Sequence, residues 1–235
     1  MSAVVVAAGQ SQRFRKSLEV ETENSARPND FRSKALIEMG GKALIVHTLE
    51  RLSVLALHEV VVVVSESDAD IFRSLISSLE LPPHHPQVKI SYGGASRKDS
   101  VRLGLENLEP IDRVCIHDGA RPFLTRALLE RLNAASLEYG TAIPGLPVVD
   151  TIKEVDPQNM VLRTIDRSRL VRVQTPQFFK WREILEAHRR LKESPQEFTD
   201  DASLFEALEI PVKTVLGEAS NIKVTTVEDL PRLIS

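Results

Sequence analysis

The sequence predicts an α/β fold, in which helices cover both faces of a mostly parallel sheet to give a three-layer sandwich. One observation is the valine-rich run 3–8, which is short, apolar and stopped by Gly9, as is typical of a buried strand. Another is the alternation of such runs with stretches of helical apolar spacing, because helices that connect parallel strands cover both faces of the sheet. The third is a length of 235 residues with 42% hydrophobic residues, enough to bury one large core.

Further strands and helices are expected in alternation along the first two thirds of the chain. Apolar, β-branched runs predict strands at 59–64, 88–92, 113–117 and 141–147. A helix is expected at 43–52, and three more are predicted from apolar residues that share one face: Ile71, Leu75, Ile76 and Leu79; Val101, Leu105 and Leu108; Leu128, Leu132 and Ala135. Ser96 with Asp99 resembles a capping box, and Thr125 is placed to cap the last of these helices.

The pattern changes near residue 148. Residues 148–172 alternate short apolar and charged stretches around a turn at 156–159, which predicts a β-hairpin that projects from the body as an arm. Helices are expected near 181–191 and after Ser203, and strands at 212–215 and 222–224. We therefore expect one domain, 1–235, with a hairpin arm at about 148–172.

Charge and composition exclude several kinds of partner. The 30 basic and 33 acidic residues give a formal charge of −3, which offers no electrostatic footprint for a nucleic acid. No stretch approaches the ~18 apolar residues of a membrane-spanning helix, and no secretory signal pattern surrounds the first strand, so no membrane partner is expected. Cys115 is the single cysteine, which excludes an intrachain disulfide and favours a cytoplasmic location.

Polar and glycine-rich loops follow the predicted strands at their carboxyl ends, where open parallel sheets bind ligands. Ala7, Ala8 and Gly9 carry almost no side chain, so a ligand could approach their backbone amides closely. The chemistry-bearing side chains are mostly cations, together with one carboxylate suited to a hard metal ion: Arg13, Lys34, Arg121, Arg167, Lys223 and Asp118. Such a set favours polyphosphate chemistry, in which positioning and charge neutralisation supply most of the catalysis.

Two familiar nucleotide-binding patterns are missing from the sequence. No P-loop motif occurs, and the loop after the first strand lacks the second and third glycines of the dinucleotide pattern. Glu66 also lies too far along the chain to be the ribose-binding acid expected about 20 residues after the glycines. The sequence therefore does not favour a dehydrogenase.

Seven short motifs stand in the order found in 2-C-methyl-D-erythritol 4-phosphate cytidylyltransferases, and the resemblance covers essentially the whole chain. The motifs are Ala7-Ala8-Gly9-x-x-x-Arg13, Gly93-Gly94-x-x-Arg97-x-Asp99-Ser100-Val101, His117-Asp118-Gly119-Ala120-Arg121-Pro122, Asp150-Thr151-x-Lys153, Thr175-Pro176-Gln177, Thr199-Asp200-Asp201-Ala202-Ser203 and Asn221-Ile222-Lys223-Val224-Thr225. The resemblance implies a Rossmann-like nucleotidyltransferase fold. It also implies transfer of CMP from CTP to 2-C-methyl-D-erythritol 4-phosphate, with release of pyrophosphate.

The resemblance further implies roles for individual residues. Arg13, Lys34 and Lys223 would be catalytic and would neutralise the triphosphate, while Asp118 would lie beside Mg²⁺, the expected cofactor. The cytosine edge would be read by the backbone around Ala7, Ala8, Gly9 and Gly94 and by the Ser100 hydroxyl. The sugar phosphate would be bound by Arg121, Thr151, Arg167 and Thr199.

Thr151 and Arg167 fall on the predicted arm, which in this family crosses to the neighbouring subunit, so the resemblance implies a homodimer with composite sites. The segment 14–33 is longer than the family loop, and we expect it to cover CTP as a lid. Two alternatives stay open at this point. One is a cytidylyltransferase for another polyol phosphate such as ribitol 5-phosphate, and the other is a nucleotide-binding module without catalysis.

Overall fold

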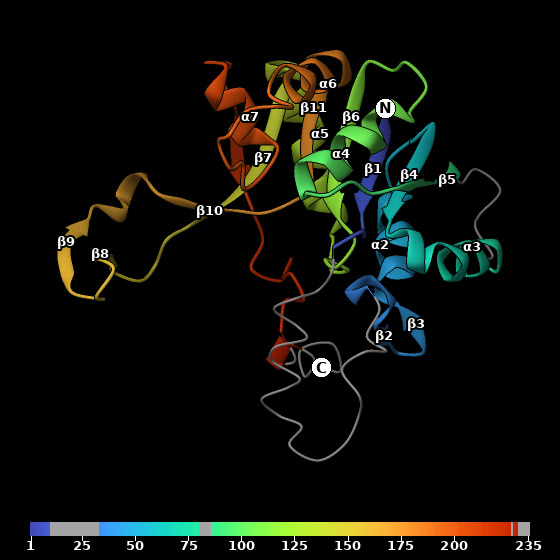
Figure 1. The fold of residues 1–235 in the computed structure, drawn as a ribbon, viewed down its shortest axis with the longest axis horizontal. Coiled ribbons are helices and arrows are strands. Elements are labelled where there is room, and N and C mark those ends of the chain that lie inside the picture. Colours follow the sequence, from blue (N-terminus) through green and yellow to red (C-terminus); the bar gives the residue numbers. More distant parts are fainter. Residues whose placement is uncertain (10–32, 80–85, 227, 230–235) are drawn as a thin grey trace.

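The computed structural model describes residues 1–9, 33–79, 86–226 and 228–229 (Figure 1). Arg13 and the expected lid, except for Ser33, lie outside the described residues. Within the described part an eight-stranded sheet has the order β10-β7-β11-β6-β1-β4-β5, and β12 pairs with β7. The strands are β1 Ser2–Val6, β4 Glu59–Val64, β5 Gln87–Tyr92, β6 Arg113–Asp118, β7 Thr141–Pro147, β10 Val171–Val173, β11 Gln177–Lys180 and β12 Thr214–Leu216.

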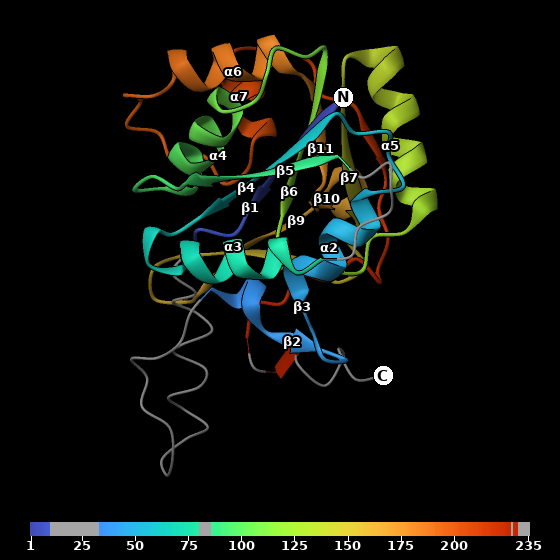
Figure 2. The ribbon, with the colours of Figure 1, turned by 90° about the vertical axis from the view of Figure 1, so that its right-hand side faces the viewer.

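Helices lie on both faces of this sheet, as the sequence predicts (Figure 2). They are α2 Leu44–Leu52, α3 Ala69–Ser77, α4 Arg97–Glu106, α5 Arg126–Tyr139, α6 Trp181–Arg190 and α7 Ala202–Ala207. Alternate residues of β1 supply the two cores, because neighbouring side chains of a strand point to opposite faces. Ala3 and Val5 pack in the core that contains buried residues of α2, α3 and α5, and Val4 packs in the core of α4, α6 and α7. The three-layer sandwich is confirmed.

The central strand β1 places the loops that follow the strands beside one another. It pairs in parallel with β4 on one side and β6 on the other. Beyond the last paired residues, Gly119 N–H donates to Val6 O at 2.9 Å, and Gly93 N–H donates to Val64 O at 2.8 Å. The loops after β1, β5 and β6 therefore meet at one edge of the sheet.

The carboxyl-terminal third differs from the sequence prediction in two places. The short strand β11 was not predicted, and it lies antiparallel between β6 and β7, so the sheet is mixed at this point. The strand predicted at 222–224 is wrong, since these residues form no strand. Their polar groups are used locally instead: Val224 N–H donates to Ala120 O at 3.0 Å, which ties the segment to the loop after β6.

The predicted arm contains an antiparallel pair, β8 Ile152–Val155 and β9 Val161–Ile165. This pair stands away from the main sheet (Figure 1). Residues 171–172, which were predicted as part of the arm, belong to β10 and pair with β7. A second small hairpin, β2 Glu38–Met39 with β3 Lys42–Ala43, precedes α2. In the described part of the chain, none of the helices combines the length and apolar character needed to cross a bilayer.

Candidate active site

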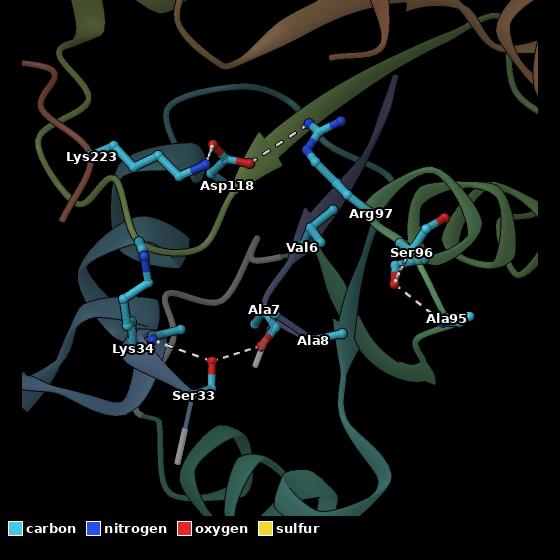
Figure 3. A pocket seen from close by; sticks show the side chains of 15 residues that line it. Val6, Ala7, Ala8, Ser33, Lys34, Ala95, Ser96, Arg97, Asp118 and Lys223 are labelled. Atoms are coloured by element: carbon cyan, nitrogen blue, oxygen red, sulfur yellow. Dashed lines mark hydrogen bonds and ion pairs between the residues drawn. The ribbon is translucent and has the colours of Figure 1, made fainter. Parts of the chain in front are cut away.

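A cavity of about 480 Å³ lies at the edge where the loops after β1, β5 and β6 meet (Figure 3). Most of the residues predicted for nucleotide and phosphate binding line it: Ala7, Ala8, Gly9, Lys34, Gly94, Ser100, Asp118 and Lys223. These residues come from five separate segments of the sequence. Their convergence in one cavity supports the prediction that ligand chemistry is located at this edge.

One wall of the cavity is formed by backbone next to two glycines, and a side chain at either glycine would collide with neighbouring atoms. A Cβ atom on Gly93 would lie 2.4 Å from Ala8 Cβ, and one on Gly94 would lie 2.5 Å from Asp99 Cβ. The loop is held by Ser100, whose hydroxyl donates to Ser96 O at 2.9 Å and accepts from Gly94 N–H at 3.1 Å. Ser96 in turn caps α4, because its hydroxyl accepts from Asp99 N–H. This wall offers a ligand a fixed, polar backbone surface.

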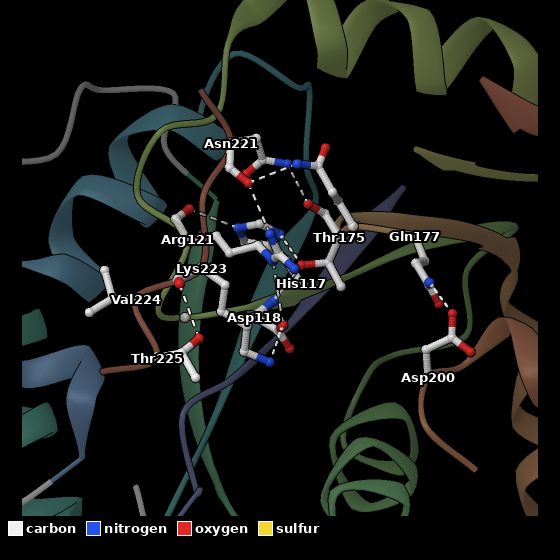
Figure 4. A network of polar contacts seen from close by, with 12 residues as sticks. His117, Asp118, Arg121, Thr175, Gln177, Asp200, Asn221, Lys223, Val224 and Thr225 are labelled. Carbon is white, nitrogen blue, oxygen red and sulfur yellow. Dashed lines mark hydrogen bonds and ion pairs between the residues drawn. The ribbon is translucent and has the colours of Figure 1, made fainter. Parts of the chain in front are cut away.

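Asp118, at the end of β6, is the charged centre of the opposite wall (Figure 4). Its Oδ2 lies 2.7 Å from Lys223 Nζ and 3.6 Å from Arg121 Nε, and its Oδ1 lies 3.7 Å from Arg97 Nη2. Burial alone would raise the pKa of Asp118. The positive charges of Lys223, Arg97 and Arg121 outweigh burial and hold that pKa well below its usual range, so Asp118 is ionised at neutral pH.

Lys34 joins the two walls. Its Nζ donates to Val224 O at 2.9 Å, directly beside Lys223 in sequence. The preceding Ser33 hydroxyl donates to Ala7 O at 2.7 Å, at the end of β1. The segment 33–34 is therefore fixed to the first strand and to the Lys223 loop at once.

The remaining predicted residues lie apart from the cavity lining. Arg121 is directed into the protein, where its Nη1 donates to Asn221 O at 2.9 Å. Thr199 is exposed on the loop before α7. Thr151 and Arg167 are exposed on the arm, and the Arg167 guanidinium donates to Val149 O. In a single chain the structure therefore brings together the predicted nucleotide residues and not the predicted acceptor residues.

Sequence reasoning assigned no role to Arg97, although it stands in the second family motif. Its side chain lines the cavity and ion-pairs with Asp201 at 2.9 Å. A charged residue at the first position of a helix is usually a solvated surface residue, so spacing alone did not mark Arg97. The available signal was its position three residues after Gly94, in a loop already predicted to touch the ligand.

The donor set fits Mg²⁺ bound together with a triphosphate. Among the described residues that line the cavity, Asp118 is the only carboxylate, and the described part holds no group of three or more His, Cys, Asp or Glu side chains able to bind a metal. Mg²⁺ commonly takes one or two carboxylates and fills its remaining positions with water and substrate phosphates. Asp118 would therefore be the protein ligand of such an ion.

An α/β sheet whose carboxyl edge combines a bare backbone wall with cations around one carboxylate defines a nucleotide-dependent phosphoryl-transfer protein of the nucleotidyltransferase class. A family profile described as 2-C-methyl-D-erythritol 4-phosphate cytidylyltransferase (IspD) matches residues 1–233. The chain belongs to this family, whose members are cytidylyltransferases.

Relatives and solved structures agree with this assignment. The chain is 41% identical over 234 residues to 2-C-methyl-D-erythritol 4-phosphate cytidylyltransferase of Geobacillus thermodenitrificans, covering 97% of this chain and 92% of the relative. It is 40% identical over 200 residues to the Bacillus mycoides protein of the same name, with 85% and 87% covered. The crystal structure of 4-diphosphocytidyl-2C-methyl-D-erythritol synthase from Anaerococcus prevotii superposes with a TM-score of 0.80 at 29% identity, covering 99% and 95% of the two chains.

Proposed function

We propose that the chain transfers CMP from CTP to 2-C-methyl-D-erythritol 4-phosphate, with release of pyrophosphate, in non-mevalonate isoprenoid precursor synthesis. Family membership supports the reaction. The observation that carries the proposal is the cavity in which Lys223 and Arg97 flank Asp118, with Lys34 also in the lining, opposite a bare backbone wall. The cytoplasmic location expected from the single cysteine remains part of this proposal.

The reaction needs charge neutralisation more than proton transfer. The acceptor is a phosphate monoester whose second pKa is about 6, so it is already an anion near pH 7 and needs no general base. One of its oxygens attacks the α-phosphorus of CTP, the bond from that phosphorus to the β-phosphate bridge breaks, and pyrophosphate leaves with the electron pair. Two anions must approach each other, and we assign Lys34 and Lys223, which both line the cavity, the task of reducing their repulsion. We assign the same task to Arg13, which lies outside the described residues.

The expected Mg²⁺ would be held by Asp118, and when bound it would neutralise triphosphate oxygens. The ionised state of Asp118 at neutral pH favours such binding. The same carboxylate lies 2.7 Å from the Lys223 ammonium and orients it toward the cavity.

Cytosine would be selected by the backbone of Ala7, Ala8 and Gly94. These atoms lie on the bare wall, where a Cβ on Gly94 would collide with Asp99. Backbone donors and acceptors at fixed positions can distinguish bases by their hydrogen-bonding edges. Ser100 contributes by holding this loop, because its hydroxyl accepts from Gly94 N–H at 3.1 Å and so keeps the neighbouring backbone groups in place.

The acceptor phosphate would be bound by Thr199 together with Thr151 and Arg167 from the arm of a second subunit, whereas Arg121, whose Nη1 donates to Asn221 O, would reach it only after its side chain moves. This arrangement explains why the arm residues lie on an exposed hairpin rather than at the cavity of their own chain. Guanidinium groups suit this task because they bind phosphate through two parallel hydrogen bonds. The active form would therefore be a homodimer.

Pyrophosphate release from CTP and Mg²⁺ tests the reaction, with 2-C-methyl-D-erythritol 4-phosphate and ribitol 5-phosphate offered in parallel. Release with the first acceptor and not the second supports the proposal, and ATP in place of CTP is the control for base selection. Release only with ribitol 5-phosphate would assign a different acceptor. Tight CTP binding with no release from either acceptor would indicate a nucleotide-binding module.

A further inference from the structure

Arg97 occupies the side of Asp118 opposite Lys223 (Figure 3). Lys223 contacts Oδ2 of the carboxylate, whereas Arg97 Nη2 faces Oδ1 at 3.7 Å. The two cations come from distant segments, the amino end of α4 and the loop after β12. Asp118 is therefore held from two sides.

The Arg97 guanidinium is itself fixed from behind. Its Nη2 donates to Asp201 Oδ2 at 2.9 Å, and the Asp201 side chain is only 1% exposed. His188 Nε2, from α6, lies 3.3 Å from the other oxygen of Asp201. Burial lowers the pKa of Arg97, but the charges of Asp201 and Asp118 outweigh burial and raise it, so the cation persists at every physiological pH.

Asp201 is bound to the sheet through Gln177 of β11. The Gln177 side-chain oxygen accepts from Asp201 N–H at 3.2 Å and from Ala202 N–H at 3.1 Å, and its nitrogen donates to Asp200 Oδ2 at 2.7 Å. These three bonds fix the loop immediately after Thr199, the residue proposed for acceptor binding. The Arg97–Asp201 pair is thus a direct link between the nucleotide cavity and that loop.

The Arg97 and Asp201 side chains are 27% and 1% exposed, and an ion pair removed from water to this degree is a weak source of stability, because the desolvation of the charges offsets most of their attraction. A contribution to folding stability therefore does not account for the presence of the Arg97–Asp201 ion pair. Its position offers a different explanation, since it joins the residue beside Asp118 to the backbone beside Thr199.

We infer that Arg97 is a positioning residue for CMP transfer: it fixes the Asp118 carboxylate against Lys223 and, through Asp201, holds the nucleotide cavity and the acceptor loop in one geometry. The inference rests on the proposed function and extends it to residues that the family motifs left without a role. Misplacement of reacting groups by about 1 Å is enough to slow an enzyme about 100-fold.

The test uses the full chain and compares Arg97→Gln, Asp201→Asn and the double variant. Arg97→Gln leaves the buried Asp201 carboxylate without its guanidinium, and Asp201→Asn leaves the Arg97 guanidinium, which is 27% exposed, with Asp118 as its remaining carboxylate. Each change is therefore expected to lower stability as well as activity, the first change more than the second. The double variant removes both charges, and its midpoint of thermal unfolding is expected to return toward that of wild type. Its kcat/KM for 2-C-methyl-D-erythritol 4-phosphate is expected to stay about 100-fold below wild type.

Two further measurements separate positioning from a loss of fold. CTP affinity by calorimetry is expected to change less than about threefold in the double variant, because the backbone wall that reads the base is intact. Arg102→Gln, on the same helix, breaks the 2.9 Å pair with Glu106 outside the cavity and is the matched control, with kcat expected to stay at the wild-type value.

The outcomes are distinguishable. A folded double variant with low kcat/KM and unchanged CTP affinity supports the positioning role. A double variant that regains both stability and wild-type turnover overturns that role while leaving the proposed function intact. A wild-type chain that releases no pyrophosphate with any acceptor overturns the proposed function, and the positioning role with it.

Discussion

Lys34 is the residue at which the two walls of the cavity meet. Its ammonium group donates to Val224 O at 2.9 Å, and the neighbouring Ser33 hydroxyl donates to Ala7 O. The side chain therefore brings a positive charge to the cavity and also fixes the backbone next to Lys223. We expect both effects to act on the phosphates of the nucleotide, whereas the Ser33 hydroxyl contacts Ala7 on the proposed base-reading wall.

Lys34→Ala is expected to lower kcat about 100-fold or more, since removal of one charge-stabilising donor from an active site has this order of effect. Steady-state kinetics with CTP and the methylerythritol acceptor measure it. The control is Lys42→Ala, which removes an exposed cation of the nearby β2–β3 hairpin that pairs with Glu50 of α2. This change is expected to leave kcat unchanged. Equal turnover in Lys34→Ala and wild type would exclude Lys34 from the reaction.

His117 has a single consistent arrangement of hydrogen bonds. Because Arg121 O can only accept, His117 Nε2 donates to it at 3.1 Å. Thr175 Oγ1 accepts from Asp118 N–H at 3.1 Å and lies 3.0 Å from His117 Nδ1, to which it donates. The imidazole is neutral in this arrangement, and burial is the main cause that lowers its pKa to about 4.

This shift predicts acid sensitivity. The folded pKa of His117 lies below the unfolded value of about 6.5, so its contribution to stability is complete above pH 6.5 and is lost as pH falls toward 4. We expect the free energy of unfolding to fall by about 2 kcal/mol between pH 7.5 and 5 from this residue. Urea unfolding of wild type and His117→Asn at both pH values measures it, and the same loss in the two proteins would contradict the prediction.

The residues of the site were predictable to different degrees. Ala7 and Gly94 were found because small residues after a strand have a direct physical meaning, namely close approach of backbone to ligand. Arg97 was missed because its role depends on Asp201, about one hundred residues away, and sequence spacing contains no information about that contact. Ser33 was likewise placed only in a polar loop, although its hydroxyl is bonded to the end of β1.

Helix α4 is the element that presents Arg97 and Ser100, and its distance from the sheet is set by one glycine. Gly104 faces the adjacent strands β1 and β4, where a Cβ would lie 2.6 Å from Val4 Cγ1 and 2.7 Å from Val63 Cγ2. Both neighbours are β-branched side chains of central strands and have little freedom to move. Helix α4 therefore packs against the sheet with its backbone at Gly104 in direct contact with the side chains of β1 and β4.

Gly104→Ala is expected to destabilise the protein by about 2 kcal/mol, because overpacking strain of about 3 kcal/mol exceeds the ~1 kcal/mol that alanine gains in a helix. Displacement of α4 would also shift Arg97, so kcat is expected to fall. Urea unfolding and steady-state kinetics on the same preparations measure the two effects. A variant more stable than wild type would show that the sheet accommodates the methyl group.

At the level of elements, the long periodic segments were predictable and the short ones were not. The helix at 43–52 and the strands at 59–64 and 141–147 are confirmed nearly to the residue, since each has a clear apolar period. Strand β11 has four residues and no period long enough to recognise. Its antiparallel place between β6 and β7 is decided by tertiary pairing alone.

The whole molecule has one feature that its own core does not explain, the arm. Val149, Met160 and Leu162 are 72%, 66% and 60% exposed. All three belong to the arm, whose hairpin stands away from the sheet (Figure 1). We expect a partner to cover these exposed apolar side chains, because large exposed apolar patches mark interaction sites. The proposed homodimer would cover them, while the expectation of a single domain over 1–235 stays a prediction.

If each site combines the cavity of one subunit with the arm of its partner, two differently damaged chains should repair each other. Lys34→Ala removes a cavity residue and Arg167→Ala an arm residue, so either homodimer is expected to be nearly inactive. In an equal mixture that exchanges subunits, the mixed dimer has one site with both defects and one with neither. About a quarter of all sites are then intact, and about a quarter of wild-type kcat is expected to return.

The control for this mixture interferes with the arm surface itself. The substitutions Met160→Glu and Leu162→Glu place two charges on the exposed apolar hairpin. When both substitutions are added to each of the two damaged chains, light scattering is expected to show monomers, and activity is expected not to recover on mixing. Leu137→Glu, at a 63% exposed position on α5, is the matched change outside the arm and should leave recovery intact. No recovery in a mixture that light scattering shows to be dimeric and exchanged would place Arg167 in the site of its own chain, because only sites shared between subunits can be restored by mixing.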